Sequence, residues 1–359
     1  MRFHAQICLA IAAILLVACN DGRPAGNLRR MHEVAAPKQG PYVTIEPIGA
    51  VNLNGVPRHM TLNGGVLYAF LNEYGLATLD VSDAAHPVLT SHLAGKPGHV
   101  TPGTHRYFMG LVDGGRMFAA DRYHGLALLS LADPLRPQYV STRKIPGDQP
   151  SDIARIDGDL FIAAGGSGLA HARADAVGTT ASLVLPFFDF VTAAVFYPPH
   201  YLLLADNFTG GMQILDVRNP VKPALVHNMQ ICGFCDSIEP FDGFIVIGGR
   251  RGGLIVVDMS DPANPSLLSY FMDGFNTISC QTRWGKTRLI VATHMGTIDV
   301  FELADPRRPL WLGRVAAGAP VHSLAVKDDI LYAGANYVTS NNPSGKPEQL
   351  RVYRLVEHK

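Results

Sequence analysis

The chain has 359 residues, and its 30 basic and 30 acidic residues give no formal net charge at pH 7. Since no block of like charge stands out, the composition argues against a nucleic-acid-binding surface, and we expect no nucleic-acid partner. The composition agrees instead with a compact body that contains 36 glycines.

The N-terminal segment predicts export and lipid attachment. An apolar stretch from Ile7 to Val17 follows Arg2 and is too short to span a bilayer as a stable helix. It ends in Leu16-Val17-Ala18-Cys19, which resembles a bacterial lipobox, whose cysteine is diacylated and becomes the new N-terminus. We therefore expect a signal peptide of residues 1–18 and lipidation at Cys19, since stable anchoring needs more than one acyl chain. The alternative is an ordinary secretory signal that is cleaved elsewhere.

Residues 19–41 are expected to form a flexible tether, because they are rich in Gly, Pro, Arg and Lys and show little apolar periodicity. Asn20 rather than Asp follows Cys19, so the enterobacterial signal for inner-membrane retention is absent. We expect the protein in the bacterial cell envelope, anchored to the outer membrane and facing the periplasm or the cell surface. Lipid should be its only membrane contact, since no second stretch is long enough to span a bilayer.

Residues 42–359 are organised by a repeated phrase. A glycine opens it, aliphatic residues close on an acidic or hydroxyl residue, and Asp-Pro follows with another proline three residues on. The cleanest copy runs from Gly253 to Pro265. The other copies open at Gly75, Gly125, Gly168, Gly211, Gly296 and, without a glycine, Leu350. Their spacing of 42 to 54 residues counts seven units.

Each unit is predicted to hold four antiparallel strands, A to D. A turn such as Asn63-Gly64-Gly65, followed by the apolar run Val66-Leu67-Tyr68-Ala69, is a hairpin signal and places strands A and B. The aliphatic run of the phrase is strand C, and its continuous apolar character indicates a strand covered on both faces. The proline behind the Asp-Pro turn places strand D at the periphery, where a missing N–H is tolerated. This is the blade pattern of a β-propeller.

The ends of the repeat region predict how the ring closes. The final unit has strand A at His322–Val326, strand B at Ile330–Ala333 and strand C at Leu350–Leu355, but no strand D. Residues Tyr42–Val51 form a strand without a blade. The predicted fold class is therefore all-β: a seven-bladed β-propeller over residues 42–359, closed by an N-terminal strand that completes the last blade.

The phrase Leu254-Ile255-Val256-Val257-Asp258, with Asp261-Pro262 and Pro265 behind it, resembles the LVIVD repeat of bacterial and archaeal surface or exported proteins. The resemblance covers most of the chain from about Pro57 onward. It implies a propeller and an envelope location, and it transfers no catalytic motif. The copy at Gly168 departs from the pattern, because His171-Ala172-Arg173-Ala174-Asp175 replaces the aliphatic run. The register of the third blade is therefore an open question.

The two faces of such a ring differ in sequence. The A-to-B and C-to-D turns share one face and repeat, whereas the B-to-C and D-to-A loops share the other and vary. Loop residues of the second face that could hold a partner are Tyr74, Tyr123, His124, Phe208, Arg251 and His294. We expect a protein, peptide or glycan partner there.

A count of eight residues back from strand B places one residue of each D-to-A loop at the mouth of the central channel. Starting from Leu67, Leu160, Phe244 and Ile330, it gives His59, Asp152, Asp236 and His322. Imidazoles and carboxylates that converge could hold a divalent metal and activate water. The alternative is that they only bond loop backbone and water, which the lack of a short ligand spacing favours.

Two cysteines of one D-to-A loop, Cys232 and Cys235, have the spacing of a redox motif. No helix N-terminus is expected there to lower a thiol pKa, so we predict a structural disulfide between them. Cys280, in the next blade, is expected to be a small buried side chain.

Three functions remain open: a lipid-anchored envelope propeller that binds a partner through its loop-rich face, a metal-dependent envelope enzyme with its site at the channel mouth, and a passive spacer. The sequence establishes no cofactor and leaves open whether the protein is an enzyme.

Overall fold

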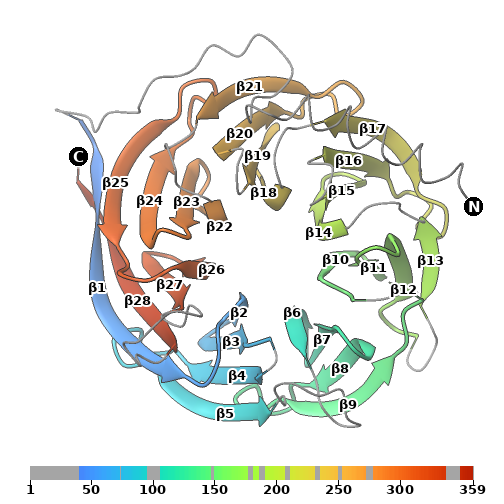
Figure 1. The fold of residues 1–359 in the computed structure, drawn as a ribbon, viewed down its shortest axis with the longest axis horizontal. Coiled ribbons are helices and arrows are strands. Elements are labelled where there is room, and N and C mark those ends of the chain that lie inside the picture. The colour runs from blue at the N-terminus through green and yellow to red at the C-terminus, as the bar shows by residue number, and fades with distance from the viewer. Residues whose placement is uncertain are drawn as a thin grey trace, which may run out of the picture.

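The computed structural model describes residues 40–72, 74–94, 106–146, 149–176, 181–185, 191–206, 211–230, 235–249, 253–271, 278–336 and 348–358. Seven antiparallel sheets of four strands each are arranged around a central axis (Figure 1). The seven-bladed β-propeller predicted from the sequence is confirmed. Among these residues, no helix is long and apolar enough to cross a membrane.

The first three blades follow chain order from the axis outward. Blade 1 is β2 (His59–Asn63), β3 (Val66–Phe70), β4 (Gly75–Asp80) and β5 (Val88–Ala94). Blade 2 is β6 (Tyr107–Asp113), β7 (Arg116–Asp121), β8 (Gly125–Ser130) and β9 (Gln138–Arg143). Blade 3 is β10 (Asp152–Ile156), β11 (Asp159–Ala163), β12 (Leu169–Arg173) and β13 (Ser182–Leu185).

The next three blades repeat this order. Blade 4 is β14 (Val191–Tyr197), β15 (Tyr201–Asp206), β16 (Gly211–Asp216) and β17 (Ala224–Gln230). Blade 5 is β18 (Cys235–Pro240), β19 (Phe244–Gly249), β20 (Gly253–Asp258) and β21 (Ser266–Phe271). Blade 6 is β22 (Ile278–Trp284), β23 (Arg288–Thr293), β24 (Thr297–Glu302) and β25 (Leu310–Ala316).

Blade 7 joins the two ends of the ring. Its strands are β26 (Val321–Lys327), β27 (Ile330–Ala335), β28 (Glu348–His358) and, on the outside, β1 (Tyr42–Leu53). The strand β1 pairs with β28 from Tyr42 opposite His358 to Leu53 opposite Glu348, as Figure 1 shows. The rings of Tyr42 and His358 also stack, with their centroids 4.3 Å apart. The predicted closure by the N-terminal strand is confirmed.

The repeated phrase is explained by how strand C packs. In β20 the side chains alternate between two blade interfaces: Ile255 and Val257 join the core shared with blade 4, and Leu254 and Val256 the core shared with blade 6. All four are 5 % exposed or less, and burying each contributes about 1.5–3 kcal/mol to folding. A strand with both faces covered favours apolar side chains at every position, which is why the run in β20 is continuous.

The glycine that opens the repeated phrase is required by the backbone conformation at that position. Gly125 has a φ of 106°, a conformation that side chains rarely adopt. A Cβ at this position would lie 2.4 Å from the carbonyl oxygen of Arg143 on the neighbouring strand. Positive φ recurs at the equivalent residues of other blades: Gly75, Gly168, Gly253 and Gly296.

The third blade keeps its four strands although its phrase is degenerate. The register runs from Asp159 opposite Arg173 to Ala163 opposite Leu169, which settles the question that the sequence left open. His171 takes an aliphatic position and is 6 % exposed. Its Nε2 lies 2.7 Å from the carboxylate of Asp159, so this buried ring has a polar partner. A paired polar group therefore replaces apolar packing in this blade.

Candidate functional site

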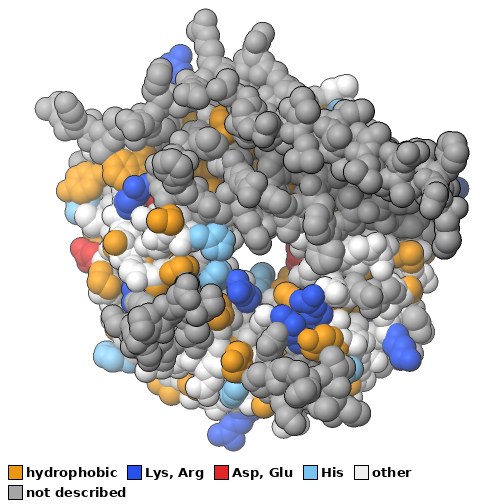
Figure 2. Space-filling model, in the orientation of Figure 1, with side chains coloured by type: hydrophobic (Ala, Val, Ile, Leu, Met, Phe, Trp, Pro, Cys, Tyr) orange, Lys and Arg blue, Asp and Glu red, His pale blue; other side chains and the backbone are white. Residues whose placement is uncertain are grey.

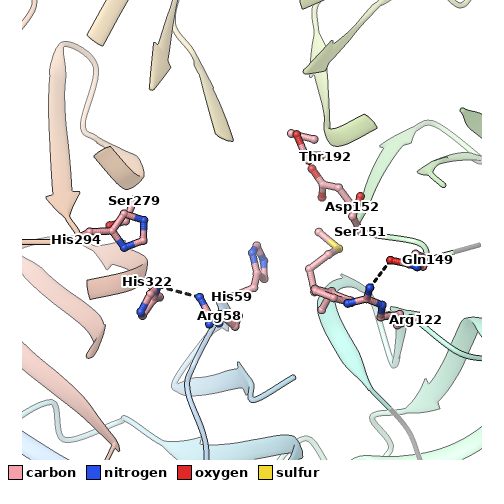
Figure 3. A pocket seen from close by; sticks show the side chains of 13 residues that line it. Arg58, His59, Arg122, Gln149, Ser151, Asp152, Thr192, Ser279, His294 and His322 are labelled. Atoms are coloured by element: carbon pink, nitrogen blue, oxygen red, sulfur yellow. Dashed lines mark hydrogen bonds between the residues drawn. The ribbon is translucent and has the colours of Figure 1, made fainter. Parts of the chain in front are cut away.

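A cavity of about 410 Å³ lies at one mouth of the channel (Figure 3). Its walls are the beginnings of innermost strands and the loops that follow second strands, so it opens on the loop-bearing face that the sequence singled out. The lining residues are Arg58, His59, Phe108, Met109, Arg122, Gln149, Ser151, Asp152, Thr192, Ala193, Ser279, His294 and His322.

Three of the four mouth residues predicted from the sequence, His59, Asp152 and His322, line this cavity. Asp236 is the second residue of β18, and its side chain lies outside the part of the chain that the structure describes. The cavity also contains His294, which the sequence placed among the residues facing a partner.

The count that selected these residues mixes two registers. The strands β3 and β11 begin at Val66 and Asp159, one residue before the positions used in the count. Counted from the observed starts, the equivalents of His322 in blades 1 and 3 are Arg58 and Ser151. Sequence reasoning therefore missed Arg58. Starting the count at Val66, the first residue of its apolar run, would have found it.

Backbone bulges explain why unlike side chains reach the same place. The pairing of the innermost strand shifts register at Val191/Ala193, Cys235/Ser237, Ile278/Cys280 and Val321/Ser323. The extra residue of a bulge leaves the regular ladder, so its side chain can be directed elsewhere. The residues at these four bulges are Thr192, Asp236, Ser279 and His322.

Hydroxyl groups near the mouth join neighbouring blades. Ser151 donates a hydrogen bond to the carbonyl of Val191 over 3.1 Å, and Thr192 donates to that of Cys235 over 3.2 Å. Ser279 donates to the carbonyl of Val321 in the same way. These bonds occupy the hydroxyl protons, so the three side chains hold the blades in register.

Arg58, His322 and His294 form a cluster on one side of the cavity (Figure 3). The Nη1 of Arg58 lies 3.0 Å from the Nδ1 of His322. A guanidinium only donates, so Nδ1 is the acceptor and the neutral ring carries its proton on Nε2. The rings of His322 and His294 meet edge to face, with centroids 5.3 Å apart. Because Nδ1 faces a cation, that atom is not available to a metal.

Arg122 lies on the other side of His59 in the same view and donates a hydrogen bond to the Oε1 of Gln149 (Figure 3). Its guanidinium carbon is 5.6 Å from the ring centre of Phe108, and that of Arg106 is 5.7 Å from it. Arg106 also donates to the hydroxyl of Tyr123 over 3.1 Å. Cation–π contacts thus fix a basic and aromatic wall on blade 2.

The two remaining titratable groups respond to burial in opposite directions. Burial lowers the pKa of His59 to about 4, so its imidazole is neutral at pH 7. Burial raises the pKa of Asp152 to about 6. Backbone N–H groups of Ala194 and Ile153 donate to the two oxygens of this carboxylate over 2.9 and 2.8 Å and oppose the shift.

The metal hypothesis finds no support among the described residues, which include no group of three His, Cys, Asp or Glu side chains that could hold an ion. The carboxylate of Asp152 is instead engaged by backbone N–H groups, as the alternative interpretation expected. The four-residue set that includes Asp236 stays a prediction.

The other predicted residues divide into exposed and internally bonded ones. Tyr74 and Tyr123 are 42 % and 43 % exposed. The Nδ1 of His124 lies 3.1 Å from the buried carboxylate of Asp121. Phe208 and Arg251 lie outside the described residues.

The cysteine predictions are tested only in part. Cys19 and Cys232 lie outside the described residues, so lipidation and the disulfide with Cys235 stay predictions. Cys235 is 2 % exposed. Cys280 is half-buried, although the sequence predicted a buried side chain, and it makes no disulfide with any described residue. Burial of the thiol raises its pKa to about 12, which makes it unreactive at neutral pH.

Solved structures share this fold at low sequence identity. A structure described as that of U3-55K aligns with a TM-score of 0.66 and 14 % identity over 87 % of this chain and 98 % of that chain. The RRP9 WD40 repeats align with a TM-score of 0.65 and 12 % identity over 90 % and 100 %. The computationally designed Ika8 protein aligns with a TM-score of 0.59 and 11 % identity over 86 % and 99 %. The chain thus has the β-propeller fold that these proteins have.

The sequence model of the LVIVD repeat matches residues 236–273, which span the strands of blade 5. The resemblance seen in the sequence is therefore confirmed, and the chain carries an LVIVD repeat. No curated protein matches the sequence.

Proposed function

We infer that this protein is a lipid-anchored component of the bacterial cell envelope that binds a protein, peptide or glycan partner through its loop-bearing face. The observation that carries the proposal is the cavity of about 410 Å³ at the channel mouth. Its volume falls within the range of about 300–1,000 Å³ that is usual for ligand sites. Residues from the region of every blade except blade 5 line it among the described residues.

The rim of the mouth adds large side chains suited to contact with a partner. Tyr74 and Tyr123 expose much of their rings, and exposed tyrosines give contact area together with a polar group. Tyr123 is oriented by Arg106, so little side-chain freedom would be lost when a partner binds.

The envelope location rests on the lipobox resemblance at Cys19. The full-length chain and the variant Cys19→Ser should be expressed in a bacterium fed a labelled fatty acid. The full-length chain should carry the label and fractionate with membranes, whereas Cys19→Ser should do neither. Equal membrane association of the two proteins would remove the anchor from the proposal.

Partner binding is tested by capture from envelope extracts with the full-length chain. The double variant Tyr74→Ala/Tyr123→Ala should lose partners that the unchanged protein retains. Tyr139→Ala is a matched control, because Tyr139 on the outer strand of blade 2 is also 43 % exposed and its hydroxyl also has a side-chain partner. The same captured proteins with the unchanged chain and with both variants would refute the proposal.

The alternative function, a metal-dependent enzyme, can be tested directly. Protein purified without chelator or affinity tag should be analysed for metal. A stoichiometric metal that is lost in His59→Ala and His322→Ala would favour the enzyme over the binding protein.

A further inference from the structure

The outer strands of the ring expose apolar side chains at one end. In β5, β9, β13, β17 and β21 the second residue is apolar and between 38 and 55 % exposed. These residues form the apolar belt: Leu89, Tyr139, Leu183, Leu225 and Leu267. A residue that serves the core would be buried, so exposure at the same position of five blades indicates a surface for interaction.

The belt lies at the edge of the turn-bearing face. Each of its strands follows a connection from the third strand of the blade, so the first residues of the strand lie beside that face. All exposed large apolar side chains of the described residues lie at this edge, except Tyr74, Tyr123 and Met295 in loops of the opposite face. Farther along β17, the exposed side chains are those of Asn228 and Gln230. Apolar exposure is therefore concentrated at one edge of the ring.

The chain enters the ring at the same edge. As the outer strand of blade 7, β1 pairs antiparallel with the third strand and runs in the same direction as the other outer strands. Its first residue, Tyr42, therefore lies at the turn-bearing edge and is 47 % exposed. Residues 19–41, the tether predicted from the sequence, lead to this point. A flexible chain of that length spans about 25–30 Å on average, so a lipid on Cys19 would hold this edge near the bilayer.

The recurrence of the belt favours a bilayer over a protein as its partner. A protein contacts one sector of a ring, whereas a bilayer presents the same surface to every blade. The belt includes Tyr139, and Trp311 takes the equivalent position in β25. Tyrosine and tryptophan are the residues enriched at membrane–water interfaces. The carboxylates of Asp83, Asp133 and Asp261 in the nearby turns argue against attraction to anionic headgroups, so the contact would be apolar.

We propose that the apolar belt lies against the lipid bilayer in the anchored protein, with the turn-bearing face toward the membrane and the channel mouth away from it. The inference rests on the proposed function, because it needs the lipid on Cys19. It adds the orientation of the ring and leaves the loop-bearing face open to a partner. Figure 2 shows this open face, where basic and histidine side chains border the central opening.

Trp311 is a natural reporter of this contact, because it takes the belt position of blade 6 and the chain has one other tryptophan, Trp284. The lipidated full chain with Trp284→Phe is added to phosphatidylcholine vesicles with brominated acyl chains, which quench tryptophans that touch the bilayer. The emission of Trp311 should be lower than in vesicles without bromine. If Trp284→Phe fails to fold, the difference in quenching between the unchanged chain and Trp311→Phe gives the same measurement.

The belt itself is tested by the triple variant Leu89→Ser/Leu225→Ser/Leu267→Ser in the reporter chain. Because three apolar contacts are lost, the ratio of docked to undocked protein should fall about tenfold or more, measured as lost quenching. The matched control is Asn228→Ser/Gln230→Ser, which changes exposed residues of β17 away from the belt and should leave the quenching unchanged. A melting curve of each variant identifies any that fails to fold.

A second reporter tests the orientation. Tyr74→Trp, in a chain that also carries Trp284→Phe and Trp311→Phe, places the only tryptophan on the loop-bearing face, where Tyr74 is exposed. Its emission should be the same in brominated and unbrominated vesicles, because this face would point away from the bilayer.

Three results would overturn the inference: no quenching of Trp311 in the anchored chain, equal quenching in the belt variant, or equal quenching of the reporter in Tyr74→Trp. The proposed function has its own readouts, which are membrane fractionation of Cys19→Ser and capture of envelope partners. An anchored chain that captures its partners while Trp311 is not quenched would leave that function standing and refute only the orientation.

Discussion

The two faces of the ring differ in how far their residues repeat from blade to blade. On the turn-bearing face, Asp83, Asp133 and Asp261 each accept the backbone N–H two residues on over 3.0 Å, so one local bond pattern recurs from blade to blade. At the mouth, the equivalent positions of blades 1 and 7 carry Arg58 and His322, which are unlike the hydroxyl residues of blades 3, 4 and 6. Repetition in the turns therefore marks residues that build the fold, and variation at the mouth marks residues left to interact.

The difference between the two faces can be measured in the pKa values of two carboxylates, Asp261 and Asp152. Bonds from the Asn264 side chain and the Ala263 N–H hold the pKa of Asp261 below its usual value. Burial raises the pKa of Asp152 to about 6 even though two N–H groups donate to it. At the exposed turn hydrogen bonding prevails, and inside the mouth the loss of water prevails.

The largest effect on stability is expected from a substitution at Gly125, the glycine that opens the third strand of blade 2. Gly125→Val would force a side chain into a φ of 106° and place its Cβ 2.4 Å from the Arg143 carbonyl. We expect a loss of about 3 kcal/mol or more in the free energy of unfolding, measured by urea denaturation. Gly115→Ala, at a glycine with open space around its Cβ position, is the control and should change stability little.

Effects of intermediate size are expected from two variants, one on each face, that should change either stability or binding. Asp261→Ala removes two side-chain bonds of an exposed turn and should lower the melting temperature by a few degrees at most while leaving the capture of envelope partners intact. The double variant Tyr74→Ala/Tyr123→Ala should do the reverse. If the turn variant impaired binding as strongly as the mouth variant, the assignment of separate roles to the two faces would be wrong.

The smallest effect is a pH dependence of stability with two opposing parts. The folded pKa of His59, about 4, lies below its ordinary 6.5, so the unfolded chain binds more protons and stability falls as pH drops between these values. For Asp152 the folded pKa of about 6 lies above 3.8, so the folded chain binds more protons and stability rises as pH drops through that window.

Urea denaturation at pH 7, 5.5 and 4.5 tests both signs, since the first value lies above both windows and the other two lie inside both. His59→Gln should lessen the loss of stability on acidification, and Asp152→Asn should make it steeper. Identical pH profiles for the unchanged protein and His59→Gln would contradict the first assignment.

The sequence predicted the ring because most blades share the same glycine, aliphatic strand and turn. The positive φ at Gly253 and the two-sided burial of Leu254 to Val257 are local requirements that leave a repeated trace. Even the third blade, where His171 and Asp159 replace apolar contacts, keeps its register.

The mouth was predictable in place but not in detail. Its position follows from topology, and His59, Asp152 and His322 were found by counting. Arg58 was missed because the count for blade 1 began at Leu67, one residue after the first residue of β3. The donor–acceptor pair between Arg58 and His322 joins residues 264 positions apart, and no local pattern records such a contact.

The closing strand has a mechanical consequence. Because β1 is the first strand of the ring, a force applied through residues ahead of Tyr42 acts first on the pairing between β1 and β28. The eleven residue pairs between β1 and β28 lie side by side with their bonds across the strands. Tension along β1 is thus shared by all of them at once instead of opening them one after another.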